Sequence, residues 1–354
     1  HKEYRRQRQM CIRDRKYTIA EKQQMFPHLF NSLSVVIPVL SSTFASVGRF
    51  LKHAGNMSLG MLIIDESGQA VPQSALGAIY RTRRAVVVGD PLQVEPVVTI
   101  PKVLIDILAD STCVANEYKV IENSAQTFAD NINEFNGMIG ERQVGCPLVV
   151  HRRCIEPMFS ISNLISYDNR MFNKTNKKEE YLKPENPFLI KKSGWINVEG
   201  VENGGKDHFV KNQAERVCQL MEDAVHIYSD LFETDDRIFI ITPFRTVAES
   251  MRKFIISYFS AKGYDKEILS KWTKNCVGTV HTFQGKDANE VLLVLGCSNK
   301  SAGAMNWVVK KANILNVACT RAKYRIAFIG NINDWKNRRY FREFIPNLID
   351  IINV

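Results

Sequence analysis

The sequence has 354 residues, of which 45% are hydrophobic and 24% are charged, and this composition excludes a disordered chain, a collagen-like repeat and a coiled coil. No apolar run approaches the roughly 18 residues that a membrane-spanning helix needs, so we expect no membrane partner. The formal net charge of +10, from 47 Lys and Arg against 37 Asp and Glu, points toward a polyanionic partner. The length predicts about two domains.

The first 15 residues contain six basic and two acidic residues and begin with His1 rather than Met. We expect residues 1–15 to be non-native or a disordered basic segment, and the chain to be a fragment of a longer protein. The eight cysteines include no C-x-x-C pair, and several lie within apolar runs. This usage favours a reducing, intracellular setting, namely the cytoplasm, or the nucleus if the source is eukaryotic.

Short apolar runs alternate with amphipathic stretches along the chain. The runs contain few polar residues, which is typical of strands covered on both faces, and they predict strands at 34–40, 61–64, 85–88, around 195–198, 238–242, 277–280, 291–295 and 326–329. The amphipathic stretches predict helices at 72–81, 155–165, 213–228, 247–262 and 309–322. This alternation predicts an α/β fold with a mainly parallel sheet.

A polar segment near residues 120–145 marks a candidate domain boundary. We therefore expect a first domain over residues 16–125, a second over 126–335 and a C-terminal helical extension over 336–354. A second polar stretch, 173–186, is typical of a surface loop.

Two adjacent carboxylates follow the predicted strand 61–64. Ligands of open α/β sheets bind at the carboxyl ends of the strands, so Asp65 and Glu66 are expected to face a crevice. There Asp65 would suit Mg²⁺ and Glu66 would suit the activation of a water molecule. The alternative is a strand that simply ends in exposed acids.

Three later segments combine polar residues with strand or helix ends. Gln93 follows a Gly-Asp-Pro turn and would contact a terminal phosphate, although a plain turn explains the same residues. Polar groups and Gly285, which allows close backbone approach to a phosphate, follow the strand 277–280. Arg321 lies in a helical segment and would stabilise charge on a phosphoryl group, with a surface arginine at a helix end as the alternative.

The order of the segments is more specific than any one of them. DESGQ (65–69), GDPLQ (89–93), HRR (151–153), ITPF (241–244), TFQGK (282–286) and NVACTRAK (316–323) follow one another along the chain. Their order and approximate spacing resemble motifs II to VI of superfamily 1 helicases, most of all the 5′-to-3′ branch of the nonsense-mediated-decay and Okazaki-fragment-processing enzymes. The resemblance covers roughly residues 30 to 335. It implies a RecA-like P-loop NTPase fold, with parallel sheets flanked by helices in one partial and one complete domain.

The resemblance also implies that ATP binds between two RecA-like domains and that single-stranded DNA or RNA crosses their top. It makes Asp65 the Mg²⁺ ligand, Glu66 the catalytic base, Gln93 the γ-phosphate sensor, Arg321 the arginine finger and Arg152 a second phosphate-contacting arginine, with Arg153 close enough to confuse that last assignment. The nucleotide contacts would be Gln284, Gly285 and Asp287, although the family usually has Glu in place of Asp287. The nucleic-acid contacts would be Ser42, Thr43, Thr242, His281 and Thr282.

The Walker A loop of this family is missing from the 354 residues, and only 64 residues precede Asp65. Residues 200–207 match G-x-x-x-x-G-K but lack the following Ser or Thr, so we predict a turn there. The resemblance therefore implies the C-terminal portion of an ATP-dependent helicase or translocase, inactive as this chain alone.

Two other functions stay open. The absent Walker A loop and the basic charge are compatible with a non-hydrolysing nucleic-acid-binding module. A protein-interaction fragment would use aromatic residues such as Phe254, Tyr258 and Phe259 as a partner face, where core packing is the simpler explanation. The sequence leaves DNA versus RNA and the oligomeric state undecided.

Overall fold

A computed structural model describes residues 17–115, 118–119, 123–140, 142–175, 187–204, 207–283 and 285–352. The segment 1–15, predicted to be non-native or disordered, lies outside the described residues, as does Gln284. The chain forms two compact units, the first comprising residues up to 91 and 95–134, the second 92–94 and 135 onward. Among the described residues we find no helix with the length and apolar character of a membrane span.

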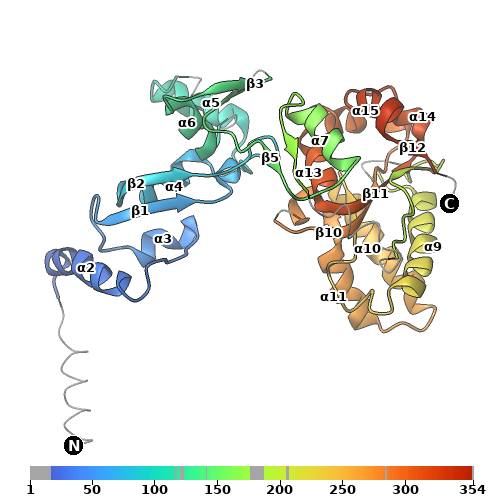
Figure 1. The fold of residues 1–354 in the computed structure, drawn as a ribbon, viewed down its shortest axis with the longest axis horizontal. Coiled ribbons are helices and arrows are strands. Elements are labelled where there is room, and N and C mark those ends of the chain that lie inside the picture. Colours follow the sequence, from blue (N-terminus) through green and yellow to red (C-terminus); the bar gives the residue numbers. More distant parts are fainter. Residues whose placement is uncertain are drawn as a thin grey trace, which may run out of the picture. The chain divides into compact units, whose positions relative to one another are not determined.

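The first unit is built on a parallel pair of strands. β1 (Leu59–Ile64) and β2 (Thr82–Val87) are joined by the crossover helix α4 (Pro72–Tyr80), whose proline suits the first turn because its missing N–H has no partner there in any helix (Figure 1). The other elements of the unit are α2 (Ile19–Ser34), α3 (Phe44–Phe50), the 3-10 turn η1 (Ser67–Gln69), α5 (Lys102–Ser111) and α6 (Ala125–Ile132).

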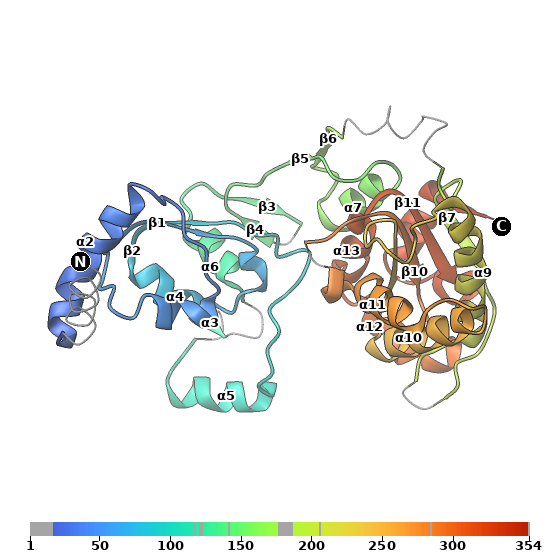
Figure 2. The same cartoon turned by 90° about the horizontal axis from the view of Figure 1, so that it is seen from below.

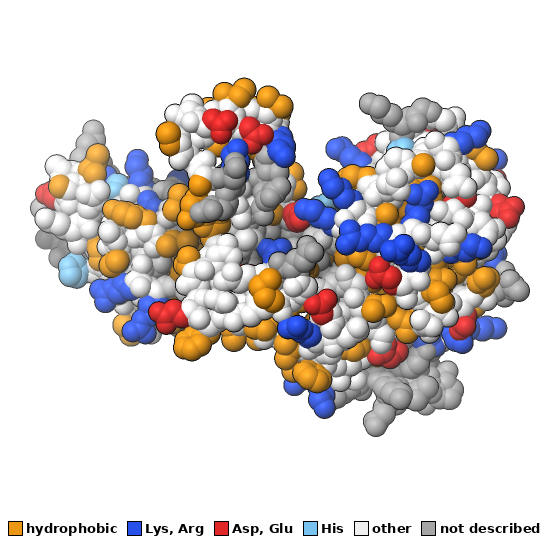
Figure 3. All heavy atoms as spheres, turned by 90° about the horizontal axis from the view of Figure 1, so that it is seen from above, with side chains coloured by type: hydrophobic (Ala, Val, Ile, Leu, Met, Phe, Trp, Pro, Cys, Tyr) orange, Lys and Arg blue, Asp and Glu red, His pale blue; other side chains and the backbone are white. Residues whose placement is uncertain are grey.

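The strands of the first unit are covered on one face only, so the prediction of two covered faces is wrong here. Ile64, Ala75 of α4 and Ala125 of α6 form a small core on the covered face. On the other face Ile63 is 67% exposed and Met61 is also exposed, because one crossover helix covers only one side of a two-stranded sheet. Figure 3 shows hydrophobic side chains at the surface of this unit.

The apolar run 34–40 is also not a buried strand. α2 extends to Ser34, and the residues after it have no regular structure and are exposed, with Val35 at 85%. A strand requires a neighbour to receive its backbone hydrogen bonds. The β1–β2 sheet has only two strands in the described chain, so this run has joined none.

The second unit contains a six-stranded parallel sheet in the order β12-β7-β11-β10-β8-β9 (Figures 1 and 2). The strands are β7 (Gly194–Asn197), β8 (Ile238–Thr242), β9 (Val277–Thr279), β10 (Ala288–Val294), β11 (Ala322–Gly330) and β12 (Asp350–Ile351). The helices are α7 (Met158–Ser166), α9 (Lys211–Ile227), α10 (Arg245–Ser260), α11 (Lys266–Cys276), α12 (Ala302–Val308), α13 (Asn313–Arg321), α14 (Ile332–Trp335) and α15 (Phe341–Leu348).

Helices flank this sheet, with α7, α13 and α15 packed together on one side and α9, α10 and α11 on the other (Figure 1). The central strands β8 and β10 are almost completely buried, as the apolar runs 238–242 and 291–295 predict. The α/β fold with a RecA-like parallel sheet is therefore confirmed. Two small sheets add to the unit, β3 (Gly137–Ile139) with β4 (Arg142–Val144) and β5 (Val150–His151) with β6 (Phe172–Asn173).

Residues 200–207 match the pattern G-x-x-x-x-G-K, and within them Gly204 and Asp207 form an isolated β-bridge. Gly204 has a φ of +99°, in the left-handed region that glycine tolerates. Gly205 and Lys206 lie outside the described residues.

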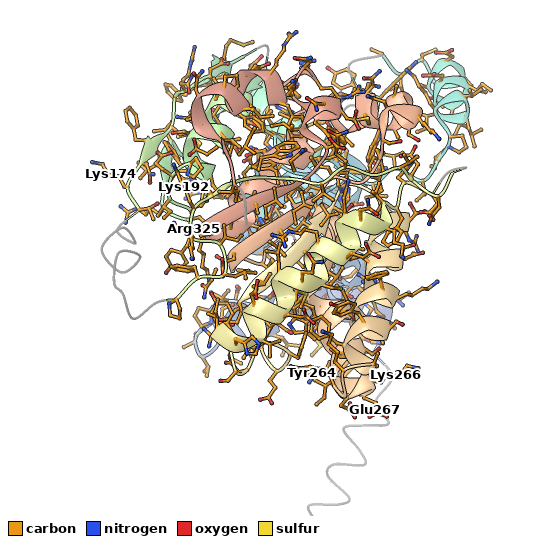
Figure 4. All side chains as sticks on the ribbon, turned by 90° about the vertical axis from the view of Figure 1, so that its right-hand side faces the viewer. Lys174, Lys192, Tyr264, Lys266, Glu267 and Arg325 are labelled. Atoms are coloured by element: carbon orange, nitrogen blue, oxygen red, sulfur yellow. The ribbon has the colours of Figure 1, made fainter. Side chains whose placement is uncertain are left out.

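The buried carboxylate of Glu290 anchors residues 189–190, which lie just before β7. Glu290 of β10 accepts hydrogen bonds from the backbone N–H groups of Leu189 (2.9 Å) and Ile190 (2.6 Å) and from the Tyr228 hydroxyl (2.6 Å). Burial raises the pKa of Glu290 to about 7, while these three donors act in the opposite direction. Arg325 of β11 holds the same segment through the carbonyl of Ile190 (3.0 Å), and Figure 4 shows it at that side of the sheet.

We expect Glu290→Gln to lower the free energy of unfolding by about 1–3 kcal/mol, because the amide nitrogen cannot accept and a buried N–H loses its partner. Urea unfolding measures this difference. Glu249→Gln, at an exposed position, is the control, and its free energy of unfolding should stay within about 0.5 kcal/mol of wild type.

The pKa of Glu290 is higher in the folded state than in the unfolded chain, so the stability of the protein falls as pH rises from about 4.5 to 7. Glu290→Gln should remove this pH dependence. Equal midpoints for wild type and Glu290→Gln would contradict this account.

Candidate functional site

Asp65, the predicted Mg²⁺ ligand, and Glu66, the predicted catalytic base, lie exposed at the end of β1. Glu66 has a φ of +53°, a left-handed conformation that costs a non-glycine residue about 1 kcal/mol or more. Its backbone N–H donates to the Asp65 carboxylate (3.0 Å), and its own carboxylate accepts from Gln69 Nε2 (3.1 Å). The surroundings must therefore hold this turn in place.

The turn after β2 supplies part of that support. Ser67 is fully buried, and its N–H donates to the carbonyl of Val88 (2.9 Å). A Cβ atom on Gly89 would lie 2.6 Å from Ser67 Oγ, and one on Gly68 would lie 2.9 Å from the carbonyl oxygen of Asp90. The glycine of the Gly-Asp-Pro turn is thus required because the two turns are in direct contact.

Helix α6 supplies the rest of the support. Ser67 Oγ donates to Gln126 Oε1 (2.6 Å), and Gln126 Nε2 donates to Asp130 Oδ1 (2.8 Å), all buried. The Ala125 N–H also donates to the carbonyl of Ala70 (2.8 Å). This helix was not predicted from the sequence, although Ser124 and Thr127 form a capping box that marks its start.

Gln126→Ala removes both side-chain hydrogen bonds behind the Glu66 turn. We expect hydrogen exchange at the backbone amides of residues 66–70 to quicken about tenfold, which corresponds to roughly 1.4 kcal/mol of lost local stability. Gln73→Ala on the exposed side of α4 is the matched control and should leave these amides unchanged. Protection that is equal in Gln126→Ala and wild type would show that the turn holds itself.

In the second unit, the structure brings Arg321 and Gln93 together. Arg321 ends α13 and is 1% exposed, so it is not the surface arginine of the alternative interpretation. Its Nη1 donates to the carbonyls of Phe283 (3.3 Å) and Lys286 (3.1 Å), and its Nη2 donates to Gln93 Oε1 (3.3 Å). Two residues predicted to contact the γ-phosphate are therefore direct neighbours.

Asn316 fixes the segment that carries Gln93. Asn316 is fully buried, and its Nδ2 donates to the carbonyl of Leu92 (3.0 Å) and to the Tyr167 hydroxyl (3.0 Å). Its Oδ1 accepts from Ser162 Oγ of α7 (2.5 Å). Residues 92–94 thus pack with α13, although they follow the strands of the first unit in sequence.

The loop after β9 contains the remaining predicted nucleotide contacts. Gly285 has a φ of +74° and open space at its Cβ position, and Asp287 forms an ion pair with Lys323 (2.7 Å). Gln284 lies outside the described residues. The backbone at Gly285 thus suits close approach by a ligand, whereas the Asp287 carboxylate already has a cationic partner.

Arg152 is exposed in the loop after β5, next to His151, which bonds within the loop. His151 Nε2 accepts from the Cys154 N–H (2.9 Å). Burial, followed by the charge of Arg153, lowers the pKa of His151 to about 4, so the imidazole is neutral at pH 7. The two adjacent arginines are therefore the cations of this loop.

The predicted nucleic-acid contacts lie in both units. Thr242 is buried at the end of β8, where its hydroxyl accepts from the Phe244 N–H (3.5 Å). His281 and Thr282 are exposed in the 3-10 turn after β9, the neighbouring strand. In the first unit, Ser42 and Thr43 are exposed just before α3.

Asp65 fits a magnesium ion that is also held by phosphates. Mg²⁺ usually keeps several waters and takes one or two carboxylates together with substrate oxygens. The described residues contain no cluster of three or more His, Cys, Asp or Glu able to hold a metal. A single exposed aspartate suits an ion that arrives with a nucleotide better than an all-protein metal cage.

The chain matches two models of known protein families. Residues 134–333 match the AAA_12 model, described as an AAA domain, and residues 1–100 match the AAA_11 model of the same description. The chain belongs to the AAA domain family. The first match alone spans more than half of the sequence.

Three curated proteins illustrate the relationship of this AAA-domain chain. Mouse "Probable helicase senataxin" is 23% identical over 328 residues, covering 90% of the chain and 11% of that protein. Mouse "DNA replication ATP-dependent helicase/nuclease DNA2" is 25% identical over 304 residues, covering 77% and 25%. "Regulator of nonsense transcripts 1" of Caenorhabditis elegans is 26% identical over 317 residues, covering 83% and 26%.

These relatives confirm the resemblance to superfamily 1 helicases of the nonsense-mediated-decay and Okazaki-processing branch. The chain spans about a tenth of the length of senataxin and about a quarter of the other two.

Proposed function

We propose that this chain is part of an ATP-dependent helicase or translocase that moves on single-stranded DNA or RNA. The observation that carries the proposal is the buried Arg321 bonded to Gln93 in one unit, together with the supported Asp65–Glu66 turn in the other. We propose that the first unit is a partial RecA-like domain and the second unit a complete one, acting inside the cell. The boundary lies near residue 135 rather than at the predicted 125, because α6 packs in the first unit, and the predicted extension 336–354 is part of the second unit, whose sheet includes β12.

In this proposal, Asp65 would hold the Mg²⁺ that accompanies ATP, and Glu66 would accept the proton of the attacking water. Gln93 and Arg321 contact the γ-phosphate, with Arg152 as a second cation for the charge that develops there. Bond formation from the water to the γ-phosphorus breaks the bond to the ADP oxygen and yields ADP and phosphate. Gln284, Gly285 and Asp287 would contact the nucleotide, and Ser42, Thr43, Thr242, His281 and Thr282 the nucleic-acid backbone.

The alternative function is a nucleic-acid-binding module without hydrolysis. It is motivated by the basic composition of the sequence, with a formal net charge of +10. Both functions predict binding to a single-stranded oligonucleotide whose logarithmic affinity falls by about 0.7 for each contacted phosphate per tenfold rise in salt.

The protein extended into its native upstream sequence separates the two functions. The helicase proposal predicts that a non-hydrolysable ATP analogue changes its affinity for the oligonucleotide. An affinity that is salt-dependent and indifferent to the analogue would support the binding module instead.

A further inference from the structure

Trp307 differs from the other tryptophans in its exposure. The sequence has four tryptophans, and Trp195, Trp272 and Trp335 are fully buried in the second unit, whereas Trp307 is 54% exposed. Burial of an indole ring is strongly favourable, so an exposed one in a well-packed unit calls for a reason.

A rigid support lies behind this indole. Trp307 is on the last turn of α12, and its ring contacts the buried ring of Phe244 at a centroid distance of 5.9 Å and an interplanar angle of 36°. Phe244 contacts His208 in turn, at 4.6 Å. The indole is therefore braced by an aromatic row on its inner side and still has more than half of its surface open.

Positive charge surrounds the same region. Residues 299–312 and 331–343 together contain seven Lys and Arg and two Asp and Glu. A hydrogen bond from Arg338 Nη1 to Asn306 Oδ1 (2.6 Å) connects the two segments. Lys310 and Lys311 are exposed and lie three and four residues after Trp307.

The topology places Trp307 and the basic segments beyond the carboxyl ends of the sheet strands. The two segments follow β10 and β11. Of the predicted nucleic-acid contacts, Thr242 is the last residue of β8 and His281 follows β9. All four strands are parallel neighbours, so their carboxyl ends form one edge about 14 Å wide. Ligands of such sheets bind beyond this edge.

We propose that Trp307 stacks on a base of single-stranded nucleic acid and that Lys310 and Lys311 contact the flanking phosphates. This proposal rests on the proposed function and adds a base contact to its backbone contacts. An open aromatic face flanked by cations is the arrangement with which proteins bind single strands without reading sequence, because every base has a π-face.

Tryptophan emission of the chain reports on this contact directly. A 12-residue oligothymidylate at low salt is expected to quench the emission of wild type. Trp307→Phe should keep most of the affinity and lose the quenching, because Phe retains a stacking face and the other tryptophans are buried. Trp307→Ala should weaken the affinity for the oligonucleotide by about 5-fold to 150-fold. Fluorescence anisotropy of a labelled oligonucleotide measures this affinity.

Two comparisons separate stacking from a structural role. Tyr264→Ala removes a partly exposed aromatic ring just before α11 (Figure 4) and should leave the affinity for the oligonucleotide unchanged. An abasic oligonucleotide has the phosphates without the bases, so wild type and Trp307→Ala should bind it equally. A Trp307→Ala deficit that persists on the abasic strand would overturn the proposal.

The remaining outcomes distinguish this proposal from the function on which it rests. Unquenched emission, with oligonucleotide affinity equal in wild type and Trp307→Ala, would overturn stacking and leave the proposed function standing. Absence of any oligonucleotide binding by wild type at low salt would count against both the proposed function and the stacking.

Discussion

Replacing Glu66 with Gln in the full-length protein is expected to abolish ATP hydrolysis while sparing ATP binding. A general base contributes about 10²-fold to 10⁴-fold to such a reaction, and an amide cannot take the proton of the attacking water. The substitution retains an oxygen that can accept the hydrogen bond from Gln69, so the turn after β1 should persist. Steady-state hydrolysis and equilibrium binding of a fluorescent ATP analogue measure the two effects separately.

Glu95→Gln is the matched control for this prediction, since Glu95 is an exposed acid of the same unit outside the turn. It should leave the turnover number within about twofold of wild type. If Glu66→Gln kept more than a tenth of the wild-type turnover, Glu66 would not be the base.

Replacing Arg321 is expected to produce the second large loss. An arginine that contacts the transferring phosphoryl group is worth about 10³-fold to 10⁵-fold in turnover. Arg321→Lys keeps the charge but cannot reproduce the planar guanidinium that reaches Gln93 and two backbone carbonyls at once. We therefore expect the turnover number of Arg321→Lys to fall at least a hundredfold.

Stability needs to be followed in the same variants, because Arg321 is buried. Arg321→Ala should also lower the free energy of unfolding by about 1–3 kcal/mol, since it leaves buried carbonyls without donors. Arg245→Ala, at an exposed position of α10, is the control for charge removal and should change neither quantity. Wild-type turnover in Arg321→Lys would remove the arginine from the proposed reaction.

The second sheet could be predicted from sequence because its strands are buried on both faces. β8 is apolar up to its last residue, Thr242, and β10 is apolar from Val291 onward, so composition alone identifies these runs. The run 34–40 has the same composition but forms no strand, because pairing depends on neighbours far away in the chain. The exposure of one face of β1 was not predicted for the same reason, because the covering of a strand also depends on neighbours far away in the chain.

The candidate site was predictable only in part. The order of the motifs led to Arg321 and Gln93, which the structure brings into contact. No local pattern indicates that Gln126 bonds to Ser67, 59 residues earlier. The ion pair between Asp287 and Lys323 was missed too, since it joins the starts of two neighbouring strands. Side-chain networks of this kind follow from tertiary packing.

ATP hydrolysis, with and without single-stranded DNA or RNA, tests the central claim most directly. It should be measured on this chain and on the protein extended into its native upstream sequence. We expect no turnover from the chain alone and nucleic-acid-stimulated turnover from the extended protein. Absence of turnover from both would contradict the helicase proposal and favour a nucleic-acid-binding module that keeps the fold without the chemistry.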